Sequence, residues 1–150
     1  MQVHLNPPLE PGSASRHAAD IVATAADISD TRLDYSPQSI ALVEEIVDGF
    51  RAEGVTGEAM AASLIGFGCY VGEVLVRHVG GSWQHAPTSH AATAPVIVVL
   101  GDARECHPVD WVFGRLRSGS AVSISDLYAA ASTSGQMPDS TCADGSSGRR

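Results

Sequence analysis

Three residues have side chains suited to acid, base and nucleophile chemistry: Glu73, His85 and Cys106. Glu73 interrupts an otherwise apolar helical stretch, and burial of a carboxylate raises its pKa toward the range useful to a general acid or base. A structural alternative is an ion pair with Arg77, four residues further along the same helix, or capping of the amides of a neighbouring strand. The spacing alone leaves both interpretations open.

Cys106 and His107 stand at a predicted strand–helix junction, where the start of a helix can lower the pKa of a thiol. Adjacent residues of a strand point to opposite faces, so this pair cannot work together as nucleophile and base. A base would have to come from elsewhere, and His85 across the sheet is the candidate. A half-buried structural cysteine is the simpler interpretation, so no catalytic set is complete.

Metal and cofactor signals are weak. His85, His90 and His107 could approach one another around the sheet, but their spacing matches no zinc motif, so we expect no metal site. The glycines Gly66, Gly68 and Gly72 do not follow the dinucleotide-binding pattern, and no Asp or Glu between Glu73 and Asp102 could bind a ribose. We therefore predict no cofactor.

The longest apolar-periodic stretch, residues 59–79, predicts a central helix buried on most sides that ends at Gly80. The apolar run before Glu73 is too short for a membrane span, which needs about 18 residues. Gly68 and Gly72 lie on one face of this helix and predict the close approach of another element. That approach would offset a helix-propensity cost of about 1 kcal/mol for each glycine.

Composition narrows the choice of partner. The 150-residue chain has a formal charge of −8, and an acidic chain is poorly suited to nucleic acid or to anionic membrane surfaces. Its three cysteines form no C-x-x-C motif and predict no disulfide framework, which favours a cytoplasmic setting. The first residues have no apolar run, so no signal peptide is expected. We predict a disordered segment over residues 1–14, one domain over 15–131 and a disordered tail over 132–150.

The flanking patterns predict an α+β fold, with helices packed on a small three-stranded antiparallel sheet. Helices are expected over residues 15–29 and from the cap Ser36 and Pro37 to Gly54, with the acidic residues of the second helix solvated. Strands are expected over 82–86, 95–100 and 103–107, the middle one being fully apolar. Two further helices are expected to start at Pro108 and, with Asp126 three residues on, at Ser123.

The segments LDYSPQSI, GCYVGEVLVRHVGGSW and P-x-x-W-V-F-G-R-L-R-S-G make residues 33–130 resemble small bacterial domains of unknown function that are common in actinobacteria. The most specific part of the resemblance runs from Tyr70 to Trp83. It implies a shared fold. It carries over no catalytic residue.

Trp83 and Trp111 are the candidate binding residues, because exposed aromatic side chains are common at protein interfaces, although packing is the default for both. We expect a non-enzymatic domain that acts through protein–protein contacts. The alternative is a small-molecule-binding or hydrolytic domain that uses Glu73, His85 and Cys106. A nucleic-acid binder is disfavoured by charge, and would require Arg104, Arg115 and Arg117 to cluster on one face.

Overall fold

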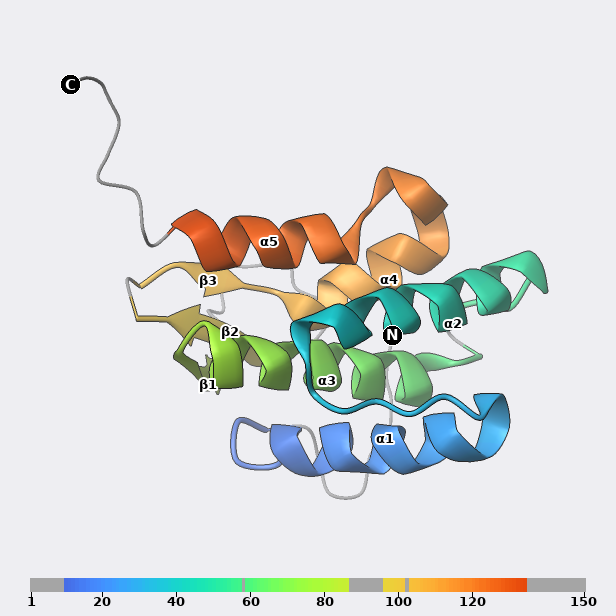
Figure 1. Cartoon of the computed structure of the whole chain (residues 1–150), viewed down its shortest axis with the longest axis horizontal. Coiled ribbons are helices and arrows are strands. Elements are labelled where there is room, and N and C mark those ends of the chain that lie inside the picture. The colour runs from blue at the N-terminus through green and yellow to red at the C-terminus, as the bar shows by residue number, and fades with distance from the viewer. Residues whose placement is uncertain (1–9, 58, 87–95, 102, 135–150) are drawn as a thin grey trace.

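The computed structural model describes residues 10–57, 59–86, 96–101 and 103–134. Within these residues, five α-helices pack with a small three-stranded antiparallel sheet, which confirms the predicted α+β class (Figure 1). The elements in chain order are α1 (Ala14–Ser29), α2 (Ile40–Ala52), α3 (Ala61–His78), β1 (Gly81–His85), β2 (Val96–Leu100), β3 (Glu105–Cys106), α4 (Pro108–Ser118) and α5 (Ile124–Ser134).

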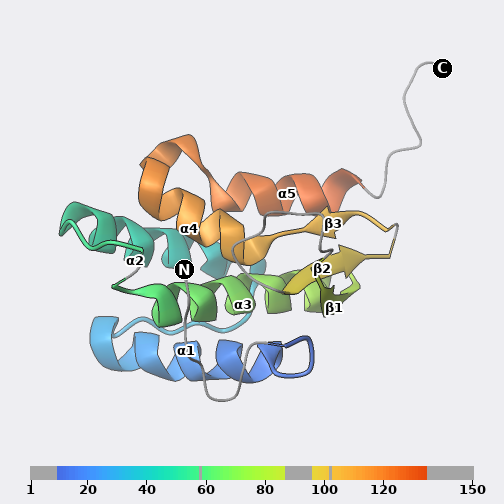
Figure 2. The ribbon, with the colours of Figure 1, turned by 180° about the vertical axis from the view of Figure 1, so that it is seen from behind.

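Helix α3 crosses the middle of the molecule, with α1 on one side and α4, the sheet and α5 on the other (Figures 1 and 2). Every residue from Leu64 to Leu75 is buried, as predicted for the central helix. Gly80 has a φ of 96°, the left-handed conformation expected after a helix end. Among the described residues, none of the helices is long and apolar enough to cross a membrane.

Two glycines allow neighbouring elements to approach the backbone of α3. A Cβ placed on Gly68 would lie 2.5 Å from the Cα of Val109 in α4. A Cβ on Gly72 would collide with the ring of Trp83 in β1. The predicted close approach is therefore confirmed at both positions, and two different elements make it.

The helices before α3 follow the predicted signals. Ala18, Ile21 and Ala25 of α1 are buried, and α1 packs along α3. A 3-10 turn over Pro37–Ser39 leads into α2, and the Ser36 hydroxyl accepts a hydrogen bond from the Ser39 N–H at 3.2 Å. The first helix begins at Ala14, the last residue of the segment expected to be disordered, and residues 1–9 lie outside the described part.

The sheet has the order β1-β2-β3, so the apolar strand lies in the middle as predicted. Trp83 pairs with Val98, and Val98 pairs with Cys106. The third strand covers only two residues of the predicted 103–107, because Ala103 has a φ of 72° and the Leu100 N–H bonds to the Arg104 carbonyl in a turn. The predicted loop with His90 lies outside the described residues.

Helices α4 and α5 begin where the sequence predicts. Pro108 occupies the first turn of α4, and the Ser123 hydroxyl accepts a hydrogen bond from the Asp126 N–H at 3.1 Å before α5. The last helix continues to Ser134, so the tail expected from residue 132 begins within a helix. Residues 135–150 lie outside the described part of the chain.

We predict that Gly68→Ala lowers the free energy of unfolding by about 1–3 kcal/mol, because the methyl group would have to displace the backbone of α4. Gly49→Ala is the matched control, since Gly49 also lies inside a helix but a Cβ placed there would meet no atom within 4 Å. The control should gain up to about 1 kcal/mol from helix propensity. Urea denaturation measures both, and equal effects of the two changes would contradict the packing role.

Candidate functional site

Glu73 lies on the buried part of α3, with an exposed fraction of 7%. Its Oε2 accepts a hydrogen bond from Trp83 Nε1 at 2.8 Å, and its Oε1 lies 3.5 Å from Arg77 Nε. Both carboxylate oxygens therefore have a partner. The predicted pair with Arg77 is confirmed, and the indole N–H is the additional partner that allows the carboxylate to be buried.

Arg77 links this carboxylate to a strained turn. The guanidinium carbon lies 3.8 Å from the ring centroid of Tyr35, within cation–π range. Tyr35 has a φ of 63°, which is uncommon for a residue with a side chain. Its carbonyl oxygen is 2.8 Å from His78 Nε2, so two successive residues of α3 hold both the ring and the backbone of Tyr35. We call Glu73, Arg77, Trp83 and Tyr35 the Glu73 cluster.

A buried chain of hydroxyl groups supports the same turn. The Tyr70 hydroxyl accepts a hydrogen bond from the Tyr35 N–H at 2.7 Å and lies 2.6 Å from the Ser39 hydroxyl. Ser39 in turn donates to the Ser36 carbonyl at 2.6 Å. Burial raises the pKa of Tyr70, so its hydroxyl keeps its proton near neutral pH. The chain joins the segment before α2 to the centre of α3.

His85 and Cys106 lie on the same face of the sheet as Trp83 but not beside Glu73. His85 is two residues beyond Trp83 in β1 and is exposed, whereas Cys106 is buried in β3 with Val98 between it and Trp83. Trp83 is the one residue of this face that reaches the Glu73 carboxylate in a hydrogen bond within the described ranges. The geometry therefore shows no acid, base and nucleophile arranged around a common point in the described part of the chain.

Cys69 is the second buried cysteine, and its thiol is unreactive. Burial, together with the Glu73 carboxylate, raises the pKa of Cys69 to about 12. A thiol with such a pKa is protonated at neutral pH and is a poor nucleophile. Within the ranges that the structure describes, no three His, Cys, Asp or Glu side chains are grouped so that they could hold a metal ion.

The two tryptophans are both half-buried and pack against the core. The Trp83 ring crosses α3 at Gly72, and its N–H is used by Glu73, so this residue contributes to the fold. Trp111 lies in α4, one turn before Arg115 and on the same side of that helix. The interface role predicted for both residues is not tested by these contacts.

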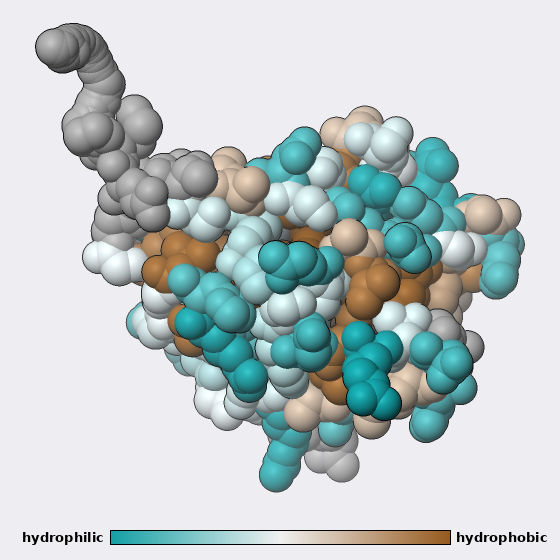
Figure 3. Space-filling model, viewed as in Figure 1, coloured by the Kyte–Doolittle hydropathy of each residue, from teal (hydrophilic) through white to brown (hydrophobic). Residues whose placement is uncertain are grey.

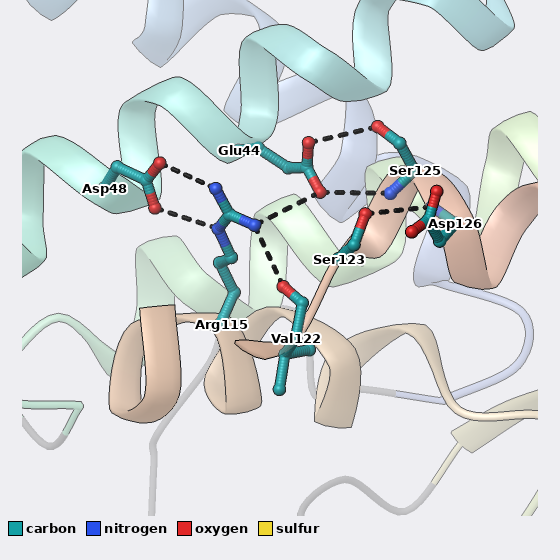
Figure 4. Close-up of polar contacts among 7 residues, drawn as sticks. All are labelled: Glu44, Asp48, Arg115, Val122, Ser123, Ser125 and Asp126. Carbon is teal, nitrogen blue, oxygen red and sulfur yellow. Dashed lines mark hydrogen bonds and ion pairs between the residues drawn. The ribbon is translucent and has the colours of Figure 1, made fainter. Parts of the chain in front are cut away.

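A charged network that the sequence did not suggest joins α2, α4 and α5 (Figure 4). Arg115 of α4 makes two hydrogen bonds to the Asp48 carboxylate of α2, at 2.8 and 2.7 Å. The same guanidinium donates to the Val122 carbonyl at 3.0 Å and lies 3.6 Å from Glu44 Oε2. We call Arg115, Asp48, Glu44 and Ser125 the Arg115 network.

Glu44 connects this network to the last helix. Its carboxylate accepts hydrogen bonds from the Ser125 N–H and the Ser125 hydroxyl, each at 3.0 Å (Figure 4). The Glu44 side chain is only 14% exposed, so the prediction that the acidic residues of α2 are solvated is wrong for Glu44. The four-residue spacing of Glu44 and Asp48 was the available signal, but it did not identify Arg115 as their partner.

Two of the three arginines considered for a nucleic-acid surface make contacts within the described fold. Arg115 is engaged by two carboxylates, and Arg104 donates to the Ala131 carbonyl at 2.8 Å. Arg117 is exposed. Two of the three arginines considered for such a surface are therefore used within the fold.

One buried side-chain nitrogen has no hydrogen-bond partner in the described part of the chain. His17 of α1 is 8% exposed, and this atom is its Nε2. Such atoms are rare in folded proteins. The sequence contained no signal for it, because a histidine on a mixed Ala-rich helix is usually exposed.

Comparisons of the chain with family models, with curated proteins and with solved structures find no match. The resemblance to small actinobacterial-type domains therefore stays a prediction.

We expect Glu73→Leu to lower the free energy of unfolding by about 1–3 kcal/mol, because it leaves the Trp83 N–H without its acceptor. Glu73→Gln keeps a carbonyl acceptor and loses only the contact with Arg77, which is 50% exposed, so its cost should stay below about 1 kcal/mol. Urea unfolding followed by tryptophan fluorescence measures both values. Equal losses for the two variants would argue against the indole contact as the stabilising one.

Replacing Arg115 should be more costly. We predict that Arg115→Met lowers the free energy of unfolding by about 3 kcal/mol, since the low-exposure Glu44 loses its compensating charge. Arg117→Met is the control on the same helix and should change stability by no more than about 0.5 kcal/mol. A similar effect of both variants in urea unfolding would contradict the role of the network.

The dependence of stability on acidic pH provides a second measurement on Arg115 and Asp48. Hydrogen bonds from Arg115 lower the pKa of Asp48 in the folded state below its ordinary value of 3.8. The resulting stabilisation is present above that value and is lost as the pH falls through the lower, folded pKa. Arg115→Met should therefore lose less stability between neutral and acidic pH than the unchanged chain.

Proposed function

We propose that this chain is a non-enzymatic, cytoplasmic module that acts through contact with another protein. The observation that supports this proposal is a row of apolar side chains along α2. Leu42, Ile46 and Phe50 recur every four residues, which aligns them on one side of the helix, and all three pack against the core while staying partly exposed. We call these three residues the α2 strip.

The α2 strip lies away from the charged side of the same helix. By helical spacing, Glu44 and Asp48 are on the opposite side, where they meet Arg115 and Ser125. Figure 3 shows brown, apolar surface between α2 and α1 on the side facing the viewer. Partly exposed aromatic side chains such as Phe50 are enriched in protein interfaces.

The alternative function, binding or hydrolysis through Glu73, His85 and Cys106, has less support. Glu73 has both oxygens engaged within the chain, and His85 is exposed at the end of β1. General acid–base catalysis needs a side chain that can donate a proton to the reacting group or accept one from it. A carboxylate that holds Trp83 and Arg77 in place is better suited to stabilising the fold.

Ile46→Glu should abolish capture of the partner, because it places a charge at the centre of the α2 strip. Ala41→Glu is the matched control, since Ala41 is exposed on another side of α2. The unchanged chain, Ile46→Glu and Ala41→Glu are compared by cross-linking and affinity capture from cells that express each form. Circular dichroism checks that each form is folded.

A protein captured by the unchanged chain and by Ala41→Glu, but not by Ile46→Glu, is the expected result. Sedimentation velocity identifies the case in which the partner is a second copy of the chain. The same captured proteins with all three forms, together with a monomer throughout, would overturn the proposal.

A further inference from the structure

The two edges of the sheet are protected differently. Strand β3 forms one edge with two residues, and one of them is the exposed, charged Glu105. Strand β1 forms the other edge with five residues, Gly81–His85, none of which is an acid, a lysine or an arginine (Figure 1). Short length, charge and proline are features by which native sheets prevent an edge from pairing with another strand. The edge at β3 has the first two of these features, whereas β1 is a strand of ordinary length and has none of them.

The hydrogen-bond ladder shows which backbone groups of β1 face away from the sheet. The Leu100 N–H donates to the Arg104 carbonyl at 2.9 Å, so the backbone groups of Leu100 are directed toward β3. Neighbouring residues of a strand direct their N–H and C=O groups to opposite sides, so those of Val99 are directed toward β1 and bond with Ser82 opposite. In agreement, a Cβ placed on Gly81 would lie 2.7 Å from the Val99 carbonyl oxygen.

The used and unused backbone groups therefore alternate along β1. Ser82 and Gln84 direct their N–H and C=O groups to β2, whereas Gly81, Trp83 and His85 direct theirs to the open edge. Within the part of the chain that the structure describes, no other strand pairs with this edge, and no backbone hydrogen bond outside the sheet reaches these three residues. Such a row of unpaired donors and acceptors is a template for an added strand.

Charge favours a second copy of this chain as the source of the added strand. The formal charge of each chain is −8, so two copies repel each other wherever their acidic surfaces meet. The longest stretch of the sequence without Asp, Glu or Arg runs over residues 78–101, and β1 lies within it; the chain has no lysine. The open edge is therefore a place where two copies can meet without like charges facing each other. A charged strand of another protein would find no residue of opposite charge in β1.

The spacing of the unpaired groups also suits a two-fold arrangement. When two β1 strands run antiparallel with Trp83 opposite Trp83 of the second copy, Gly81 lies opposite His85 of the second copy. At each of these positions the two strands can exchange both N–H···O bonds, because all the groups involved point to the open edge. The side chains are compatible with this register, since His85 is opposite a glycine and Ser82 is opposite Gln84 on the exposed face of the sheet.

From these observations we infer that the open edge of β1 is a binding site for β1 of a second copy of this chain, so that the two sheets become one continuous antiparallel sheet. This surface is different from the α2 strip, and the inference goes beyond the proposed function. Because a pair of five-residue strands buries little area, we expect a weak dimer with a Kd of about 0.1 mM.

The pairing is tested by NMR measurement of amide hydrogen exchange in the full chain, at concentrations from about tenfold below to about tenfold above the expected Kd. In the dimer the N–H groups of Trp83 and His85 gain acceptors, so their exchange should slow about fivefold over this range. Ser82 and Gln84 already bond to β2, so their exchange should change much less. Exchange at Trp83 that does not depend on concentration would overturn the inference, even if the chain dimerised through another surface.

A backbone substitution provides the second test. His85→Pro removes an N–H that points to the open edge and leaves the bonds between β1 and β2 in place, since those at this end of β1 are made by Gln84. The dimer loses this bond in both copies, so the Kd from sedimentation equilibrium should rise about tenfold. His85→Ala is the matched control, because it keeps the N–H and should leave the Kd within about twofold of that of the unchanged chain. Equal Kd values for the two variants, both folded by circular dichroism, would contradict the strand pairing.

The two proposals fail separately. Ile46→Glu alters the α2 strip and should dimerise like the unchanged chain, whereas His85→Pro should capture the same partner protein as the unchanged chain. Absence of dimers with intact partner capture therefore overturns only the inference about β1. A Trp83 amide that is protected only after a captured protein is added, and at no concentration of the chain alone, would overturn the second copy and assign the open edge to a strand of that protein.

Discussion

Burial of the central part of α3, from Leu64 to Leu75, depends on the absence of side chains at Gly68 and Gly72. At Gly68 the backbone of α4 lies directly against the helix, and at Gly72 the ring of Trp83 does. Packing at this distance brings the indole N–H of Trp83 to Glu73, one residue further along. The buried carboxylate is therefore a consequence of the close packing, since without that contact it would lack a neutral donor in the interior.

Glu73 and Glu44 are two carboxylates of low exposure that find their partners in the same way. Glu73 has an arginine and an indole N–H, and Glu44 has an arginine, a backbone N–H and a hydroxyl. In each case an arginine is combined with at least one neutral donor, so both oxygens of the carboxylate have a partner. This arrangement explains how an acidic chain with no lysine can bury acids next to its core.

Polar contacts of two kinds join α2, α4 and α5. Arg115 makes its ionic contacts between α4 and α2, whereas α5 contributes the N–H and hydroxyl of Ser125 to Glu44 and packs Ile124 and Tyr128 into the core. Helix α2 thus has two different sides, a charged one that meets α4 and α5 and an apolar strip on the other.

The sequence by itself determined the elements and the fold class, because the signals for them are local. Ser36 and Pro37 start a helix, Gly80 ends one, and Pro108 starts another, each through atoms within a few residues of one another. The apolar strand was likewise recognisable as the middle of a sheet from its composition.

Only the tertiary structure decided which polar groups meet. Asp48 and Arg115 are 67 residues apart in the chain, and Tyr35 and His78 are 43 apart. Helical spacing shows which residues share a side of a helix but not which side of another element they face. The pairing depends on the packing of α2, α4 and α5 around α3, and packing is a property of the whole chain.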